Sequence, residues 1–563
     1  MKSKSIISVI FLLLGSAIAG VAVFAGPLGL DHNEGWSRPR IGVLLIGIAI
    51  MFCAVAYYRY FNEVHSVIHK IQTFIENIPL QFITVPLVLG VILIYASFAS
   101  PGKSNEWDVS TDYFDLLARG FMNGNLYMPI EPTPELLALS NPYDPLARAG
   151  VWTPIDLSLY NGKYYMYWGP VPALILSGVY QFFHGRIGDL FLTFVFVSGI
   201  FIAQSLFLLV IWNRYFRDLS RLLLYMSILL IGLAGPLMLL RHNYGSARVY
   251  EASITGGQFF FMSGMLLSLI AVTKPIISKW SLATTGILWA LAIGTRQILA
   301  VPIGFLIFLI ALWFFRTNPR SFKKITYLIP FVLPLVFGLA CLGWYNWARF
   351  GSITETGLYY QLAGANLREH SHELFSQAYI LQNLYNYLFH AIDLSPKFPF
   401  VFMSPGRENP VFSFYSVPHI YSTEPIAGLL YTSPFAIFAG LTFFVASSKS
   451  ILNKHSLDAN DRKHLNLIIL GLSGSFLIIF GLLLAFFWVG IRYTEDFTPP
   501  LMILSVIGFW QGYQLLRSKS LPGGLYVFIG VTLAIASILL NTLLAISTNL
   551  GLIKLLIRRF PFL

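Results

Sequence analysis

Long uninterrupted apolar runs are the feature of this sequence that most constrains its fold. They recur along most of the 563 residues, of which 56% are hydrophobic and only 11% are charged. A hydrocarbon core of about 30 Å requires roughly 20 apolar residues in each spanning helix. These runs are too long and too continuously apolar for the strands of a membrane barrel, which alternate in short segments. We therefore predict an all-α polytopic membrane protein, with a single membrane domain over residues 1–563.

Counting the runs predicts about thirteen transmembrane helices. The first follows Lys2 and Lys4 and has some features of a signal peptide, but its length and the span that follows favour an uncleaved helix. The predicted spans lie near residues 2–25, 40–60, 79–99, 187–212, 222–240, 252–272, 281–295, 297–315, 325–346, 424–446, 464–487, 495–515 and 523–546.

Basic residues between the spans predict the orientation of the chain. Cytoplasmic loops are enriched in Lys and Arg, and an N-terminus in the cytoplasm places the four most basic connectors inside. The net charge of +12 is then an orientation signal and not a nucleic-acid footprint. We expect location in the cytoplasmic (inner) membrane, contact with membrane lipids and no nucleic-acid partner. The four connectors are residues 58–70, 213–221, 316–324 and 448–464.

The basic tail at 554–559 does not fit this orientation, because it would end outside. Either one span is miscounted, or the tail lies along the membrane surface as an amphipathic segment.

Two long polar segments lie outside in this topology, at residues 100–186 and about 347–423. The first is acidic in an otherwise basic chain, with eight carboxylates and four bases between residues 101 and 167. Its many aromatic side chains favour a folded loop over a disordered one. The apolar run at 170–183 is too short to cross comfortably, and we interpret it as a re-entrant or interfacial segment.

The start of the first outer loop has the pattern of an amphipathic helix. Asp108, Asp112, Asp115 and Arg119 are spaced so that a helix would carry all four on one face. An apolar face is rotated away from it, so the helix is expected to lie on the membrane surface with Arg119 paired to at least one carboxylate. The apolar face consists of Phe114, Leu117, Ala118 and Phe121, and Gly120 with residues 123–125 ends the helix.

Such a carboxylate group has two interpretations. One is a solvated face with an ordinary ion pair. The other is a general base, because a carboxylate can accept a proton from an acceptor hydroxyl and crowding of like charges raises its pKa. Asp156, which precedes a tyrosine-rich stretch, is a second candidate base, with a turn-forming role as its alternative.

Several segments resemble the GT-C-fold membrane glycosyltransferases of bacterial type. DYFDLLARGFMNGNLY at 112–127 and DLSLYNGKYYMYWGPVPALIL at 156–176 are similar to the first outer loop of that superfamily. ARVYEASI at 247–254, WYNWARFGSITETGLYYQL at 344–362 and GIRYTEDFTPPL at 490–501 are also typical of its members. The resemblance covers most of the chain, and the order and membrane placement of the motifs carry it.

The resemblance implies transfer of a sugar from a polyprenyl-phosphate carrier to a glycan, lipid or protein acceptor at the outer face. Asp112 matches the superfamily's loop carboxylate by position, with Asp108 and Asp115 as rivals. No Asp-Glu or Asp-x-Asp pair stands here. The identity of the base and the participation of a divalent cation therefore stay open.

Charged residues near the outer ends of later spans suit a lipid-phosphate leaving group, which needs cationic hydrogen-bond donors. Their alternative role is snorkelling or local pairing, for instance Arg248 with Glu251, or Arg492 with Glu495 or Asp496. The candidate substrate-binding residues are Arg241, Arg248, Glu251, Arg296, Arg492, Tyr493, Asp496, Lys163 and Tyr164.

The second outer loop contains a histidine-rich run at 368–373. On a helix, Glu369, His372 and Glu373 would share a face, as metal ligands do. A solvated cluster is the interpretation we favour, and no metal site is assigned from the sequence.

The main rival function is a transporter or flippase for a lipid-linked substrate. Transporters place ionisable residues near the middle of the bilayer, whereas this chain keeps most of them at the ends of spans. A non-catalytic membrane subunit with the same fold is the third alternative, because a fold does not by itself define a function.

Overall fold

The fold is that of a computed structural model, and the described residues cover most of the chain. They are residues 2–24, 44, 47–48, 50–52, 54–55, 59, 66, 70, 72–100, 107, 111–240, 248–273, 278–317, 325–406, 408, 416–442, 459–518 and 523–559. Two predicted site residues, Asp108 and Arg241, lie outside them, as does most of the predicted span near 40–60.

Eight helices in the described part of the chain are long and apolar enough to cross a membrane. The class predicted from the apolar runs, an all-α polytopic membrane protein, agrees with this finding, whereas the count of thirteen stays a prediction. The eight are Leu80–Ala99, Asp189–Tyr215, Arg221–Leu240, Val249–Thr273, Gln297–Arg316, Leu328–Phe350, Asn460–Leu484 and Gly523–Ser547.

Other predicted spans differ from a simple crossing helix. One, α10 (Lys279–Thr295), has only 17 residues. Another, α18 (Thr494–Ser518), carries two acidic residues in its first turn and two prolines inside it. The span predicted at 424–446 instead begins with the strand β7 (Pro425–Ile426), the one-turn helix α14 (Leu429–Thr432) and a 3₁₀ helix. Apolar composition alone did not predict these interruptions.

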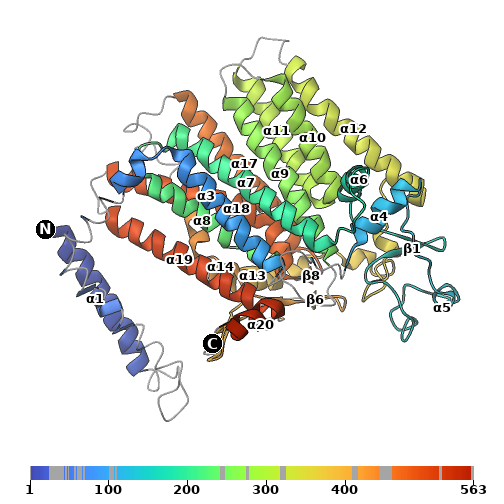
Figure 1. Cartoon of the computed structure of the whole chain (residues 1–563), viewed down its shortest axis with the longest axis horizontal. Helices are drawn as coiled ribbons and strands as arrows, with labels where there is room; N and C mark the ends of the chain where they lie inside the picture. The colour runs from blue at the N-terminus through green and yellow to red at the C-terminus, as the bar shows by residue number, and fades with distance from the viewer. Residues whose placement is uncertain are drawn as a thin grey trace. The chain divides into compact units, whose positions relative to one another are not determined.

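The helices of the described residues are of three kinds, longer α-helices, shorter α-helices and 3₁₀ helices, and Figure 1 shows their arrangement. The longer helices are α1 Lys2–Val23, α3 Leu80–Ala99, α7 Asp189–Tyr215, α8 Arg221–Leu233, α9 Val249–Thr273, α11 Ala300–Thr317, α12 Ile325–Phe350, α17 Ala459–Leu484 and α19 Gly523–Ser547. The shorter α-helices are α4 Tyr113–Met122, α5 Pro134–Leu137, α6 Val171–Val179, α13 Ile380–Phe389 and α20 Leu550–Arg559. The 3₁₀ helices are η1 Pro236–Leu240, η2 Gln297–Leu299, η4 Leu358–Tyr360, η5 Ser371–Glu373, η6 Gln377–Tyr379, η8 Pro434–Phe438 and η9 Ile491–Tyr493.

The chain divides into two compact units. The smaller comprises Met1–Thr84, Leu219–Leu223 and Tyr513–Ile529. The larger comprises Val85–Asp218, Leu224–Gly512 and Gly530–Leu563. Every predicted site residue belongs to the larger unit.

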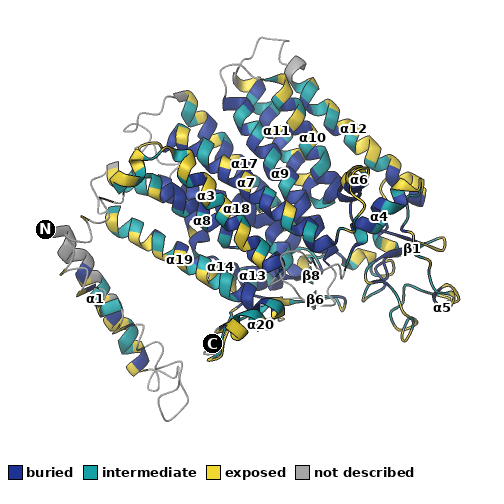
Figure 2. Ribbon diagram, viewed as in Figure 1, coloured by how far each residue is buried: buried dark blue, intermediate teal, exposed yellow. Residues whose placement is uncertain are grey.

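A row of packed helices forms the core of the larger unit. Helix α9 contacts both α7 and α10, and α10 contacts α12 (Figure 1). In the apolar segment of α9, 72% of the residues are buried, against 17% in that of α12 (Figure 2). A helix that is apolar all round and also buried is central, whereas an apolar helix with exposed sides faces lipid. Helix α9 is therefore central and α12 peripheral.

Small residues allow these helices to approach closely, as is common between membrane helices. Trp289 of α10 is fully buried and donates its indole N–H to the Phe261 carbonyl of α9 at 3.2 Å. A Cβ at Gly264 would lie 2.4 Å from that indole nitrogen, and one at Gly286 would lie 2.1 Å from the Phe331 carbonyl of α12. The absence of a side chain at both glycines sets the spacing of α9, α10 and α12.

We expect Gly286→Ala to destabilise the protein by about 1–3 kcal/mol, because α10 and α12 must separate to admit the methyl group. Thermal unfolding of the detergent-purified chain measures this. Gly304→Ala is the matched control, since a Cβ there meets nothing within 4 Å inside the same kind of helix. Equal melting temperatures for the two variants would contradict the close-packing argument.

The first outer loop begins with α4, as the amphipathic pattern predicts, but the helix starts at Tyr113. Asp112 is therefore the N-cap residue, and only Asp115 and Arg119 of the predicted polar face lie within the helix. Its apolar side is buried as expected, and α4 packs against α6. The first backbone N–H groups of α4 find a hydrogen-bond acceptor in a distant residue. The Asp189 carboxylate accepts the N–H groups of Tyr113 and Phe114 at 3.1 and 3.3 Å.

Helix α6 has nine residues and is too short to cross a membrane, as expected of this apolar run. A β-hairpin precedes it, in which β1 (Ser158–Tyr160) pairs antiparallel with β2 (Lys163–Tyr165). The two turn residues, Asn161 and Gly162, both have positive φ, which is the backbone of a type I′ turn. This hairpin is one of several short strand pairs that the all-α prediction did not include.

The second long polar segment, at about 347–423, contributes at least one strand to each of the other strand pairs among the described residues. Strand β3 (Asp393–Leu394) pairs with β4 (Val401–Phe402), β5 (Ser404–Pro405) with β7, and β6 (Ser422–Thr423) with β8 (Trp488–Val489). The pairing of β6 and β8 is parallel and joins this loop to the segment before α18. It therefore brings residues near 424 next to residues near 490.

Candidate functional site

Four side chains from four distant segments meet beside the first turn of α9. We call them the Asp156 cluster: Asp156, Tyr250, Glu424 and Arg492. The Tyr250 hydroxyl donates to Asp156 Oδ2 at 2.8 Å. The Arg492 guanidinium lies over the Tyr250 ring, 4.2 Å from its centroid, and its Nη1 contacts Glu424 Oε1 at 2.6 Å. A carboxylate and an arginine thus share one tyrosine at the end of a predicted span.

Asp156 is held in an unusual backbone conformation, with φ at 60°. Aspartate tolerates this left-handed region better than most residues do. The preceding residue is anchored because the Tyr113 hydroxyl donates to the Ile155 carbonyl at 3.1 Å, and the following Leu157 accepts the Leu362 N–H at 2.8 Å. Burial raises the pKa of Asp156, while the Tyr250 hydrogen bond and the charges of Arg492 and Arg148 oppose the rise. A carboxyl with a raised pKa is suited to proton transfer.

The β6–β8 pair positions Glu424 and Arg492. The Glu424 N–H donates to the Val489 carbonyl at 2.8 Å, and the Trp488 indole N–H donates to Glu424 Oε1 at 3.0 Å. A Cβ at Gly490 would lie 2.6 Å from Glu424 Oε2, so the close approach of this carboxylate requires glycine there. The Glu424–Arg492 pair is therefore built by tertiary contacts and not by neighbours in the sequence.

Arg492 retains unused donor capacity. A guanidinium has five N–H donors, and the Nε–H of Arg492 is buried without a hydrogen-bond partner among the described residues. Its side chain is 13% exposed. A buried donor of this kind is costly unless a ligand satisfies it, and phosphate oxygens are acceptors that guanidinium groups bind well.

A second buried ion pair adjoins the cluster. Arg296 contacts Asp496 through Nη2 at 2.7 Å and through Nε at 3.2 Å, and its guanidinium lies 5.6 Å from the Tyr493 ring centroid. Asp496 is fully buried, and its backbone carbonyl accepts from Gln258 of α9. The two-point contact satisfies both charges, so this pair is suited to holding α18 against α9 and η2.

Asp112 and Asp115 are placed differently from the expected solvated face. Asp115 is 1% exposed and is bonded to Arg119, the Tyr180 hydroxyl and the Ile187 N–H. The prediction that Arg119 pairs with at least one carboxylate is thus confirmed, while the interpretation of a solvated face is wrong for Asp115. Asp112 is 6% exposed and pairs with Arg186. Packing of α4 against α6 and α7 buries the carboxylates, which helical periodicity alone could not predict.

Arg248 pairs with Glu251, which was the alternative to phosphate contact for this arginine. Both side chains are 1% exposed, with 3.8 Å between Arg248 Nη1 and Glu251 Oε1. The Arg248 N–H also donates to the Thr111 hydroxyl at 3.0 Å, so the start of α9 is tied to the residue before Asp112. The alternative pairing of Arg492 with Glu495 or Asp496 is wrong, because Glu424 binds Arg492 and Arg296 binds Asp496.

Lys163 and Tyr164 lie on strand β2 of the hairpin. The Lys163 ammonium stands 3.7 Å from the Tyr127 ring centroid, and Tyr164 is fully buried. The contact of Lys163 with the Tyr127 ring and the burial of Tyr164 both stabilise the loop.

Two members of the Asp156 cluster were not predicted from the sequence. Tyr250 lies between Arg248 and Glu251 in the ARVYEASI segment, so its place beside two candidate residues could have indicated it. Glu424 carries no local signal, since it follows an ordinary Ser-Thr pair in a long loop.

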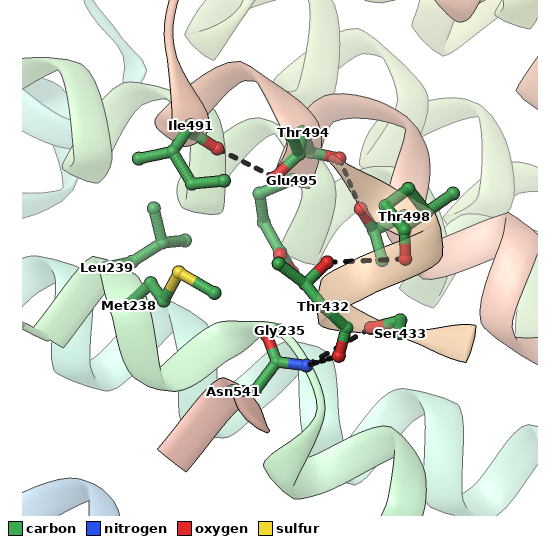
Figure 3. Close-up of a pocket in the computed structure, with 11 residues that line it drawn as sticks. Gly235, Met238, Leu239, Thr432, Ser433, Ile491, Thr494, Glu495, Thr498 and Asn541 are labelled. Atoms are coloured by element: carbon green, nitrogen blue, oxygen red, sulfur yellow. Dashed lines mark hydrogen bonds between the residues drawn. The ribbon is translucent and has the colours of Figure 1, made fainter. Parts of the chain in front are cut away.

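A small cavity of mixed polar and apolar lining lies among the helix ends beside Ile491, the residue before Arg492 (Figure 3). Its volume is about 20 Å³, and its lining includes Glu495, Thr498, Thr432 and Asn541. Glu495 is 4% exposed, and its carboxylate lies close to Gly235 (Figure 3). A cavity of this size holds one water molecule and is too small for a sugar.

An apolar groove of about 480 Å³ runs along α3, α7 and α9. Its lining includes Ile92, Phe194, Ile202 and Phe259, and nearly all of its exposed surface is apolar. Phe194 also packs against Trp107, with 5.1 Å between ring centroids. The groove lies along the middle parts of α7 and α9, and its size and apolar lining allow it to receive a hydrocarbon chain.

The fold and the site define a multi-pass α-helical membrane protein with a partly buried carboxylate–arginine cluster at the end of a helix row. No protein-family model matches the chain, and no curated protein or solved structure is significantly similar to it.

Proposed function

We propose that this protein is a membrane glycosyltransferase. It moves a sugar from a polyprenyl-phosphate carrier to an acceptor hydroxyl at the outer face of the cytoplasmic membrane. The observation that carries the proposal is the Asp156 cluster, in which a carboxylate with a raised pKa and an arginine contact the same tyrosine, and the buried Nε–H of that arginine has no partner in the described part of the chain. The resemblance of the outer-loop motifs to GT-C enzymes supports the same reaction.

The proposed reaction is a single displacement with inversion. Asp156 accepts the proton of the acceptor hydroxyl, and the oxygen attacks the anomeric carbon as the bond from that carbon to the phosphate oxygen breaks. The electron pair of that bond leaves with the polyprenyl phosphate, whose developing charge the Arg492 Nε–H stabilises. Asp112, which also lies in the first outer loop, is the rival base. The apolar groove along α3, α7 and α9 suits the hydrocarbon chain of the carrier.

Proteoliposomes containing the full chain and radiolabelled polyprenyl-phosphate sugars test this proposal. Protein-dependent release of label into a glycoside is the expected result. Absence of transfer from a panel of donors, together with protein-dependent movement of the intact lipid across the bilayer, would favour a transporter. The buried Glu495 beside its water-sized cavity is the observation that supports this second function, because ionisable groups among membrane helices commonly serve transport.

Replacing Tyr250 by phenylalanine is expected to shift the acid limb of the kcat/KM profile to higher pH. The Tyr250 hydrogen bond stabilises the charged form of Asp156 and lowers its pKa, so its loss raises that pKa further. Activity of a general base is lost as the pH falls through its pKa, which puts the shift in the stated direction. Tyr143→Phe is the control, because its hydroxyl donates to the Leu159 carbonyl instead. An unmoved acid limb in an active Tyr250→Phe variant would contradict the role of Asp156.

A further inference from the structure

Two segments of the second outer loop bring two histidines and a glutamate together. His370 is the N-cap residue of η5 and Glu373 is its last residue. His419 comes from a segment more than 40 residues later. One ligand atom from each of the three lies within 4.8 Å of the other two. The minor alternative for the histidine-rich run at 368–373 was a metal set of Glu369, His372 and Glu373, and the observed set is different. Glu369 instead lies 3.5 Å from the Asn141 amide nitrogen.

The spacing of these atoms approaches that of a metal shell. His370 Nδ1 lies 3.3 Å from Glu373 Oε1, and the His370 and His419 rings are 5.4 Å apart between centroids. A tetrahedral zinc ion with bonds of about 2.0–2.1 Å places its ligand atoms about 3.3 Å apart. One edge of such a shell is therefore already formed, and His419 offers a ring nitrogen within 4.8 Å of the other two ligand atoms.

The backbone beneath the cluster is held in place from both sides. A central segment at 485–489 receives hydrogen bonds from Ser376 and Ser422, and the Phe487 N–H donates to the Leu374 carbonyl. The two segments that carry the ligands are thus the outer neighbours of one central segment. A buried apolar cluster beneath them consists of Leu367, Leu374, Tyr379, Ile420 and Phe487. Such support positions ligands before a metal binds.

We propose that His370, Glu373 and His419 form a zinc site that fastens the 366–376 segment to the 416–424 segment. Two imidazoles and one carboxylate are a ligand set that zinc accepts with one position left open. Water or His372 fills that position, since His372 Nε2 already lies 3.4 Å from Glu373 Oε1 and its side chain is 76% exposed. Because His419 is five residues before Glu424, the bound metal would also stabilise the strand that positions Glu424 against Arg492.

Zinc content of the purified full chain tests this inference. After treatment with a chelator and dialysis against a limited excess of zinc, mass spectrometry of the metal is expected to give one tightly held zinc per chain. Glu373→Gln and the double variant His370→Ala/His419→Ala are expected to lose it. His184→Ala, which removes an exposed histidine of the first outer loop, is the matched control and should retain it. Cobalt in place of zinc should give the visible absorption of a four-coordinate site in the wild type and in His184→Ala, and should not give it in the two variants of the site.

Each outcome decides the proposal. Zinc bound equally by wild type and by the Glu373→Gln variant, or absent from both, would overturn it. Glu373→Gln keeps the shape of the side chain, so a normal elution profile and helical content show that lost zinc is not caused by lost folding. Zinc binding is measured without any sugar donor, so its outcome is independent of the glycosyltransferase proposal.

Discussion

Replacing Asp156 by asparagine is expected to lower the rate of sugar transfer by about 10²–10⁴-fold, the usual contribution of a positioned general base. Asparagine keeps the shape of the side chain and can still bond to the Tyr250 hydroxyl, but it cannot accept the acceptor's proton at neutral pH. Binding of the polyprenyl-phosphate sugar is expected to persist, because Arg492 is unchanged. Initial rates and donor affinity in proteoliposomes measure the two effects separately.

Two further aspartates give this prediction its controls. Asp144→Asn alters a carboxylate of the same loop that accepts the Leu146 N–H at 2.9 Å, and its transfer rate is expected to stay near that of wild type. Asp112→Asn breaks the pair with Arg186 and tests the rival base. A large loss in Asp112→Asn with full activity in Asp156→Asn would assign the proton transfer to Asp112.

Removing the charge of Asp496 is expected to destabilise the protein by about 3–5 kcal/mol, because it leaves Arg296 as an unpaired charge in a buried site. Asp496→Leu should therefore lower the melting temperature of the detergent-purified chain strongly. The effect comes from the stranded guanidinium more than from the lost attraction, since desolvation of two charges offsets most of their mutual attraction.

The double variant Arg296→Met/Asp496→Leu separates these two causes. Replacing both partners by apolar side chains of similar size removes the stranded charge, so most of the lost stability is expected to return. Equal destabilisation in the single and double variants would show that the pair contributes through its specific hydrogen bonds to the packing of η2 and α18. An unchanged melting temperature in Asp496→Leu would contradict the buried-pair argument altogether.

Local pairs were predictable from the sequence because the helix has a fixed period. Asp115 with Arg119 and Arg248 with Glu251 are four and three residues apart, and on a helix such residues are neighbours. The end of α4 at Met122 was also predictable from neighbouring residues, because Met122 precedes the Asn-Gly-Asn sequence at 123–125. Whether such a charged group is buried depends on contacts with distant segments, as the buried Asp115 shows.

Pairs across long distances in the chain were not predictable. Arg492 could have paired with acidic residues three or four positions away, yet Glu424, 68 residues earlier in the numbering, binds it. The parallel β6–β8 pair makes that contact, and no periodicity in the sequence indicates which two short strands will meet. Asp189 capping α4 and His419 joining His370 are further cases of the same kind.

The sequence by itself determined the membrane class, most of the apolar helices and the residues at their ends that carry charge. These follow from the length of apolar runs and from the cost of placing charge in hydrocarbon, and both are properties of single segments. Only the tertiary structure decided which distant carboxylate lies beside Arg492, which aspartate has a raised pKa and which histidines meet. Those properties depend on distances of a few ångströms between segments far apart in the chain, and packing alone sets such distances.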